Sequence, residues 1–147
     1  MTEAELRAGI RDAFGTLNAV AEAAILRELA EPINLGHSER LQFEACPHFF
    51  GVKLVQTEEE IVPDSAIQDA VPEELRGALL ASDLDLSVSE MIEAELPAWL
   101  ADRWQAAGGP SHYRPAYLLF HGGMDEPRYD LEQRRWCEVE EVWPDEA

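Results

Sequence analysis

Positively charged residues are scarce in this sequence, and lysine is nearly absent. The 147 residues include 30 acidic and 11 basic side chains, for a formal net charge of −19, and Lys53 is the only lysine. Proteins bind nucleic acids and anionic membranes by neutralising phosphates with Lys and Arg. The composition therefore disfavours direct binding to either of these polyanions.

Cysteine and long apolar runs are also lacking. The two cysteines, Cys46 and Cys137, are far apart and form no paired spacing, which argues against a disulfide framework. No apolar run approaches the ~20 residues that cross a membrane, and no charged and then apolar stretch marks a secretory signal. We expect a cytoplasmic protein with free thiols. The excess of Arg over Lys is typical of a GC-rich genome and suits a bacterium.

The motifs of common enzymes are missing too. The sequence contains no Walker loop, no dinucleotide fingerprint and no calcium loop. His121-Gly122-Gly123 resembles an esterase oxyanion turn, but the Gly-x-Ser-x-Gly elbow that accompanies it is absent, so a simple turn is favoured. Carboxylate pairs carry little weight, because 30 acidic residues produce such pairs by chance. We therefore predict no catalytic residues, no cofactor and no enzymatic activity.

One alternative rests on the few histidines and cysteines. His37, Cys46, His48 and Cys137 are zinc-ligand types, but they lack the close pairs that structural zinc sites usually show. Because alternate residues of a strand share a face, Cys46 and His48 stay compatible with a common site. A small hydrolase or metal-dependent enzyme built on Cys46, His48 and His121 is the alternative, although no metal site is predicted.

What the sequence does contain is enough apolar material for a core. Hydrophobic residues make up 46%, with four Trp, five Phe and three Tyr. A chain of this length typically forms one domain and buries roughly 68–70% of its unfolded surface. We expect one domain over residues 1–147.

Three segments show helical signals. Thr2 with Glu5 forms a capping box before an apolar stripe that continues to about residue 30, with a bend or break expected at Gly15. A second capping box, Ser87 with Glu90, precedes another stripe that ends before Gly108 and Gly109, and Pro97 predicts a kink or two consecutive helices within it. Between these segments, a proline at position 72 is well placed as the first residue of a short helix ending near residue 80.

Strand signals fall in two regions. Alternation over residues 41–45 and an apolar, aromatic run over 49–55 predict an antiparallel hairpin. Strands are also predicted over 116–120, 128–131 and 134–143, with Cys137 facing inward in the last. The charge run Glu58–Glu60 is most simply a loop or strand end. The predicted fold is α+β, a mostly antiparallel sheet of about four to five strands with helices packed on one face.

The acidic residues are concentrated in the middle of the chain. Residues 57–102 hold thirteen carboxylates and one cation, Arg76, for a net charge of −12. We predict that this stretch contacts a partner. Trp99 lies on an apolar stripe and is first expected in the core, but an exposed Trp there would suit an interface. The predicted partner-binding residues are Glu58, Glu59, Glu60, Asp83, Asp85, Glu90, Glu93, Glu95, Trp99 and Asp102.

This charge distribution predicts a non-enzymatic protein that binds and occludes a basic surface of a partner protein. An immunity protein that neutralises a bacterial nuclease toxin fits, because a nuclease must display a cationic cleft for its substrate. A phage-encoded inhibitor of a nucleic-acid-binding defence complex would use the same electrostatics. If the acidity were incidental, the charge would instead be scattered evenly over the surface.

Overall fold

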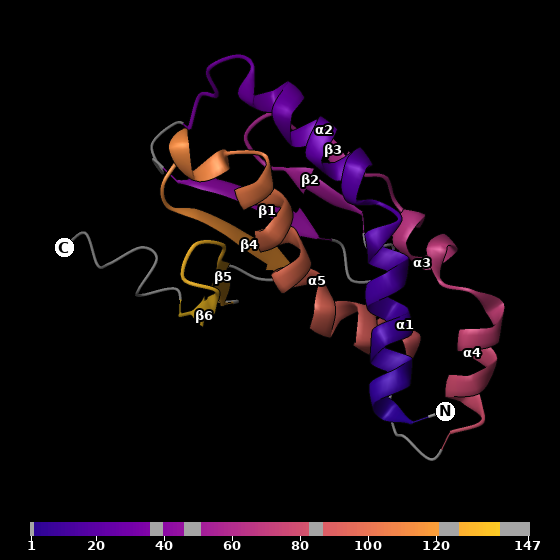
Figure 1. The fold of residues 1–147 in the computed structure, drawn as a ribbon. Helices are drawn as coiled ribbons and strands as arrows, with labels where there is room; N and C mark the ends of the chain where they lie inside the picture. The colour runs from indigo at the N-terminus through magenta and orange to yellow at the C-terminus, as the bar shows by residue number, and fades with distance from the viewer. Residues whose placement is uncertain (1, 36–39, 46–50, 83–86, 121–126, 139–147) are drawn as a thin grey trace.

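The fold is a mixed sheet with helices against one face (Figure 1). The computed structural model describes residues 2–35, 40–45, 51–82, 87–120 and 127–138. Within these ranges the sheet has six strands in the order β3-β2-β1-β4-β5-β6. The strands are β1 (Leu41–Ala45), β2 (Val52–Leu54), β3 (Glu59–Val62), β4 (Ala116–Phe120), β5 (Arg128–Asp130) and β6 (Arg135–Cys137). The α+β class is confirmed.

The sheet differs from the prediction in two respects. The central strands β1 and β4 run parallel, whereas the four outer pairs of the described sheet are antiparallel. The sheet is therefore mixed, because a long crossover through three helices returns the chain beside β1. The sixth strand is β3, which follows a tight turn at Glu58 (φ 60°) and uses the last two residues of the charge run. Paired with β2 at one edge of the sheet, Glu59 and Glu60 are exposed.

The N-terminal helical segment is two helices, α1 (Glu3–Gly15) and α2 (Asn18–Leu29). The predicted capping box at Thr2 is present: its side chain accepts from the backbone of Glu5, whose carboxylate accepts from Thr2 in return. The predicted break falls just after Gly15. It lets the two helices cover different parts of the core.

The remaining helices are α3 (Ala66–Ala70), α4 (Glu73–Leu80), α5 (Val88–Ala106) and a 3₁₀ turn, η1 (Gly109–Ser111). The second capping box, Ser87 with Glu90, starts α5 as predicted. Pro97 lies inside α5, which continues through it as one helix. Pro72 is the N-cap of α4, one position before the expected first helical residue.

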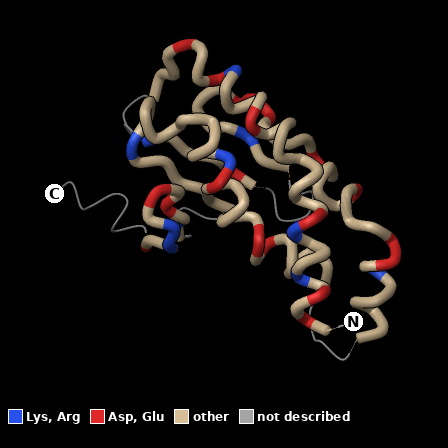
Figure 2. Tube along the Cα trace, in the orientation of Figure 1, with Lys and Arg blue, Asp and Glu red and all other residues tan. Residues whose placement is uncertain are grey.

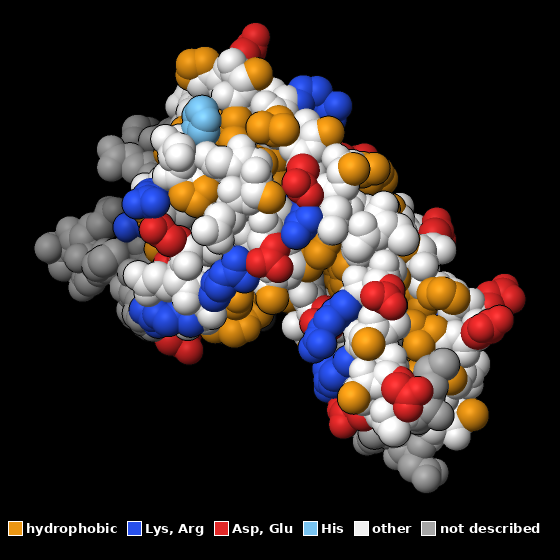
Figure 3. All heavy atoms as spheres, in the orientation of Figure 1, with side chains coloured by type: hydrophobic (Ala, Val, Ile, Leu, Met, Phe, Trp, Pro, Cys, Tyr) orange, Lys and Arg blue, Asp and Glu red, His pale blue; other side chains and the backbone are white. Residues whose placement is uncertain are grey.

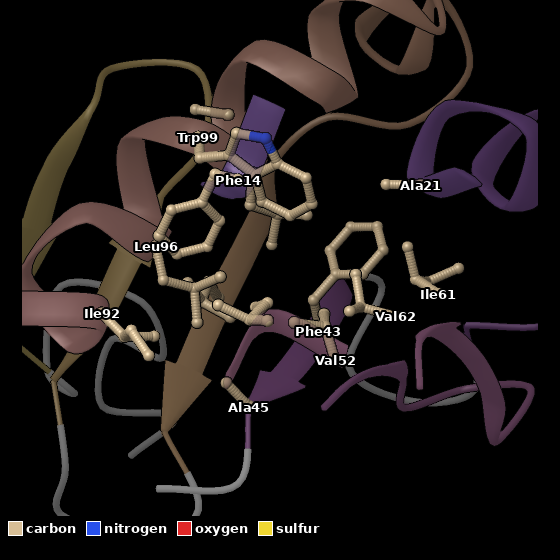
Figure 4. Packing of buried hydrophobic residues seen from close by; sticks show 14 of the residues in the cluster. Phe14, Ala21, Phe43, Ala45, Val52, Ile61, Val62, Ile92, Leu96 and Trp99 are labelled. Atoms are coloured by element: carbon tan, nitrogen blue, oxygen red, sulfur yellow. The ribbon is translucent and has the colours of Figure 1, made fainter. Parts of the chain in front are cut away.

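The core lies between the sheet and the helices. In β1 the buried residues Leu41, Phe43 and Ala45 alternate with half-buried Gln42 and Glu44, so one face of the strand enters the core. Figure 4 shows aromatic and aliphatic side chains from α1, α5 and the strands meeting there. The Phe43 ring meets Trp104 edge-on, with centroids 5.6 Å apart, and this contact joins α5 to the sheet.

No helix among the described residues is both long and apolar enough to cross a membrane.

Candidate binding groove

The four acidic residues of α5 that were predicted to bind a partner divide between two sides of the helix. Glu90 and Glu93 face the ends of β4 and β6, where they line a groove. Glu95 and Asp102 instead line a hollow beside α1, together with Arg11 and Arg103. A helix turns about 100° per residue, so neighbours in sequence are separated in space.

The carboxylates on the α1 side are neutralised within the chain. Arg11 donates to both oxygens of Glu95, Nε to Oε2 at 3.0 Å and Nη2 to Oε1 at 3.2 Å. This pair raises the pKa of the Arg11 guanidinium, first through the hydrogen bond and then through the charge of Glu95. Asp102 Oδ1 accepts from Arg134 Nη2 at 2.6 Å. These two carboxylates thus connect α5 to α1 and to the β5–β6 turn.

Trp99 belongs to the core rather than to an open surface. Its side chain is nearly buried, and its ring lies 5.1 Å from that of Phe14. The indole Nε1 donates to Asn18 Oδ1 at 2.7 Å, so its polar atom is satisfied inside the protein. The structure therefore supports the core interpretation of this residue.

The other predicted residues lie elsewhere. Glu58, Glu59 and Glu60 line a hollow of about 590 Å³ between α2 and β3, at the edge of the sheet opposite β6. Asp83 and Asp85 fall outside the described residues. The stretch 57–102 therefore does not form one continuous acidic face in the part of the chain that the structure describes.

Acidic and basic side chains are intermixed over much of the surface. Acidic positions recur along every helix from α1 to α5 (Figure 2). On the face seen in Figure 3, several of the Lys and Arg side chains lie beside carboxylates. One such pair is Arg103 with Glu22, whose Nη1 and Oε2 atoms are 2.7 Å apart. Carboxylates outside such pairs are the ones left to attract a partner.

The groove that holds Glu90 and Glu93 combines acidic walls with aromatic surface. Its volume is about 560 Å³. Trp136 is 46% exposed, the only exposed aromatic side chain among the described residues. The groove is lined by Glu90, Glu93, Ala94 and Pro97 of α5, Phe120 of β4, Pro127 before β5, and Trp136 of β6.

Two neighbouring rings hold the Trp136 indole in place. Phe120 stacks on it with centroids 6.0 Å apart and an interplanar angle of 27°. Tyr129, directly opposite Trp136 in the β5–β6 register, meets it nearly edge-on at 5.4 Å and 71°. Burial is the main cause that raises the pKa of Tyr129 above its ordinary value. The indole is therefore a fixed apolar platform.

Sequence reasoning did not single out Trp136. The sequence signal that could have found Trp136 is the alternation of the last predicted strand. Cys137 was expected to face inward there, so its neighbour Trp136 belongs to the other face. Cys137 is buried and packs with Tyr117 on the face of the sheet opposite the helices. Because consecutive strand residues point to opposite faces, Trp136 faces the helix side, where the end of the sheet leaves it partly open. The groove could not be recognised from the sequence, because it forms where α5 lies beside the β6 edge of the sheet.

The face of the sheet opposite the helices carries several buried polar side chains. Arg128, Asp130 and Tyr117 lie there beside Cys137, each less than a tenth exposed. Asp130 Oδ1 accepts from the backbone amides of Glu132 and Gln133, both at 2.8 Å, and so shapes the β5–β6 turn. Burial, and then the charge of Asp130, raise the pKa of Tyr117. These groups have structural partners in the fold.

The metal and hydrolase alternatives involve residues outside the described ranges. His37, Cys46, His48 and His121 all fall there, and among the zinc-ligand candidates only Cys137 is described, as a buried cysteine outside any disulfide. Within the described residues, no group of three or more His, Cys, Asp or Glu side chains is placed to hold a metal ion.

Comparisons of the chain with protein-family models, with curated proteins and with solved structures found no match.

Proposed function

We propose that this chain is a non-enzymatic acidic protein that binds and occludes a basic surface of a partner protein, as an immunity protein covers the cleft of a nuclease toxin. The net charge of −19 supports this role, because complementary potentials speed the encounter of two proteins and suppress wrong partners. The contact is narrower than the whole acidic stretch. It centres on the groove between α5, β4 and β6.

The observation that carries the proposal is the pairing of exposed carboxylates with an exposed aromatic ring. Glu90 and Glu93 are exposed and line the same groove as Trp136. In the described part of the chain, no Lys or Arg lies within ion-pair distance of Glu93. Interface hot spots are enriched in Trp, and a polar rim surrounds them.

Carboxylates outside the groove support the proposed role by attracting a cationic partner. Glu73 and Glu74 begin α4 on an exposed surface, and Glu58–Glu60 lie at the far sheet edge. Separated carboxylates of this kind steer a cationic partner over a distance of about one Debye length, ~8 Å at physiological salt. They raise the association rate without forming the contact itself.

The test begins with capture from the native cell by the tagged wild-type chain and continues with the purified partner. We expect a protein with net positive charge whose nuclease or nucleic-acid-binding activity is lost when the chain is added in equimolar amount. The Kd of the complex between the chain and this partner should increase at least tenfold when NaCl is raised from 50 to 300 mM. A saturated partner that keeps full activity, or an affinity that salt leaves unchanged, would falsify the proposal.

The identity of that partner also separates the two biological settings. A secreted toxin that is inactivated by the chain indicates an immunity protein. A nucleic-acid-binding defence complex indicates an inhibitor carried by a phage. In both cases the occluded surface is basic.

A further inference from the structure

The Trp136 groove has the chemistry of a pocket for one cationic side chain. Its aromatic side chains and its two carboxylates belong to different elements, and none of the described residues that line it is cationic. Its volume of about 560 Å³ exceeds that of any single side chain, so it also admits the backbone of the partner around the anchoring residue. Charge complementarity therefore selects a cation as the occupant.

The indole offers a surface for cation–π contact. Phe120 and Tyr129 fix Trp136 from two sides, and almost half of its surface stays open. Trp is the best aromatic partner for a cation, and a contact of this kind is worth about 0.5–1 kcal/mol at exposed sites. Because the ring is already held by packing, binding costs little side-chain entropy.

Both carboxylates of the groove come from α5. Glu90 and Glu93 are three positions apart and so share one face of α5. Glu90 Oε1 accepts from the backbone amide of Ser87 at 3.3 Å and keeps the helix cap in place. Glu93 has no such structural task among the described contacts and provides a free pair of oxygens to a ligand.

A guanidinium fits this arrangement better than an ammonium. It is planar, so it stacks on an indole, and its fork of N–H groups donates to both oxygens of a carboxylate. An ammonium is more strongly hydrated and binds as a point charge. The groove presents both a flat ring and a carboxylate, which are the two features that distinguish arginine from lysine.

We infer that the groove binds an arginine side chain of the basic partner, with the guanidinium stacked on Trp136 and hydrogen-bonded to Glu93. The inference rests on the proposed function and names the anchoring residue of the partner. The probe is a nine-residue peptide with three arginines separated by Gly-Ser. Two peptides of the same length carry lysine or uncharged citrulline in place of arginine.

Binding is followed by ¹H–¹⁵N NMR at low salt, through the indole Nε1–H signals. We expect the arginine peptide to shift the Trp136 signal, assigned with Trp136→Phe, and to leave that of hydrogen-bonded Trp99 in place. The lysine peptide should bind several-fold more weakly, and the citrulline peptide should give no shift. An equal shift with citrulline, or lysine binding as tight as arginine, overturns the inference.

Two matched variants separate a local anchor from general attraction. Glu93→Gln removes one charge in the groove, and Glu74→Gln removes one on α4. We expect Glu93→Gln to raise the Kd for the arginine peptide at least fivefold and Glu74→Gln to raise it less than twofold. Equal effects of the two variants mean that the attraction is diffuse, and the groove is then not the arginine site.

The same variants distinguish this inference from the proposed function. If the captured basic partner is inhibited by the wild-type chain and by Glu93→Gln equally well, the arginine anchor is wrong and the occluding role stands. If no basic partner is inhibited, the proposed function has failed, whatever the peptides do.

Discussion

The indole of Trp99 donates a hydrogen bond to the side chain of Asn18, with 2.7 Å between Nε1 and Oδ1. Asn18 is the first residue of α2, and Trp99 lies in the second half of α5. The bond fixes the point where α1 ends and α2 begins against the longest helix. It also satisfies the one polar atom of a nearly buried ring.

Replacing Asn18 should therefore destabilise the protein. Asn18→Ala leaves the Trp99 N–H without its acceptor, and we expect the free energy of unfolding to fall by about 1–3 kcal/mol. Asn18→Asp keeps an oxygen at the same place and is the matched control, with a smaller loss. Urea denaturation followed by tryptophan fluorescence measures both. An Asn18→Ala midpoint equal to that of the wild type would contradict this role.

Charge reversal on α5 should depend on which side of the helix is changed. Glu95→Lys removes the carboxylate that pairs with Arg11 and lies 3.9 Å from Arg7, and it places a third cation beside these two, so we expect the unfolding free energy to fall. Glu93→Lys breaks no ion pair in the described chain and reduces the net charge of −19, so stability should stay within about 0.5 kcal/mol or rise. Thermal melts at low salt compare the two. Equal destabilisation would show that the Arg11–Glu95 pair is not a specific tether.

Two glycines should respond in opposite directions to alanine. A Cβ at Gly109 would lie 2.2 Å from ring atoms of Trp104, so Gly109→Ala forces the buried indole to move, at a cost of about 1–3 kcal/mol. A Cβ at Gly77 in α4 meets nothing within 4 Å, and Gly77→Ala should stabilise by about 0.5–1 kcal/mol. Chemical denaturation of both variants provides the comparison. A neutral Gly109→Ala would mean that the turn after α5 can relax.

The stability of the protein should fall at alkaline pH because of two tyrosines. Burial raises the pKa of Tyr117 and of Tyr129 above the ordinary value of 10.0, so folding favours their neutral forms. That stabilisation is complete below pH 10 and is lost as the pH rises through the raised pKa values. Tyr117→Phe cannot ionise there, so its melting temperature should decrease less between pH 9 and pH 11.5.

The ionisation of Tyr117 can also be followed directly by absorbance spectroscopy. Titration of tyrosinate absorbance should show the ionisation above pH 10 diminished by one residue in Tyr117→Phe. If the ionisation lost in Tyr117→Phe is centred at the ordinary value of 10.0, or if the alkaline decrease in melting temperature is identical in the two proteins, Tyr117 ionises as freely in the folded as in the unfolded chain.

Local signals in the sequence were sufficient for most of the helices. The capping boxes at Thr2 and Ser87 form as predicted, because they join residues only three positions apart. The break after Gly15 and the end of α5 before Gly109 likewise follow from local backbone chemistry. Pro97 was expected to cause a kink or to divide the segment into two helices; α5 is one helix through Pro97, which is buried, so the second alternative is wrong.

The sheet was predictable only in part. Alternation identified β1 and the last strand, and short apolar or aromatic runs identified β2 and β4, since both signals are visible in a single sequence. The parallel pairing of β1 with β4 was not visible, because it joins segments about 75 positions apart (Leu41 with Ala116) through the course of the intervening helices. Strand β3 was missed because charged residues on an exposed edge look like a loop.

The sequence by itself determined that the chain is acidic, where most of its helices begin and end, and which side chains can form a core, because these properties depend on composition and on neighbours within a few positions. Only the tertiary structure decided which carboxylates remain available: Glu95 is paired with Arg11, 84 positions away, while Glu93 lines an open groove beside Trp136. Ion pairing and surface exposure depend on distances in space, and those are set when α5 packs against α1 on one side and passes the end of the sheet on the other.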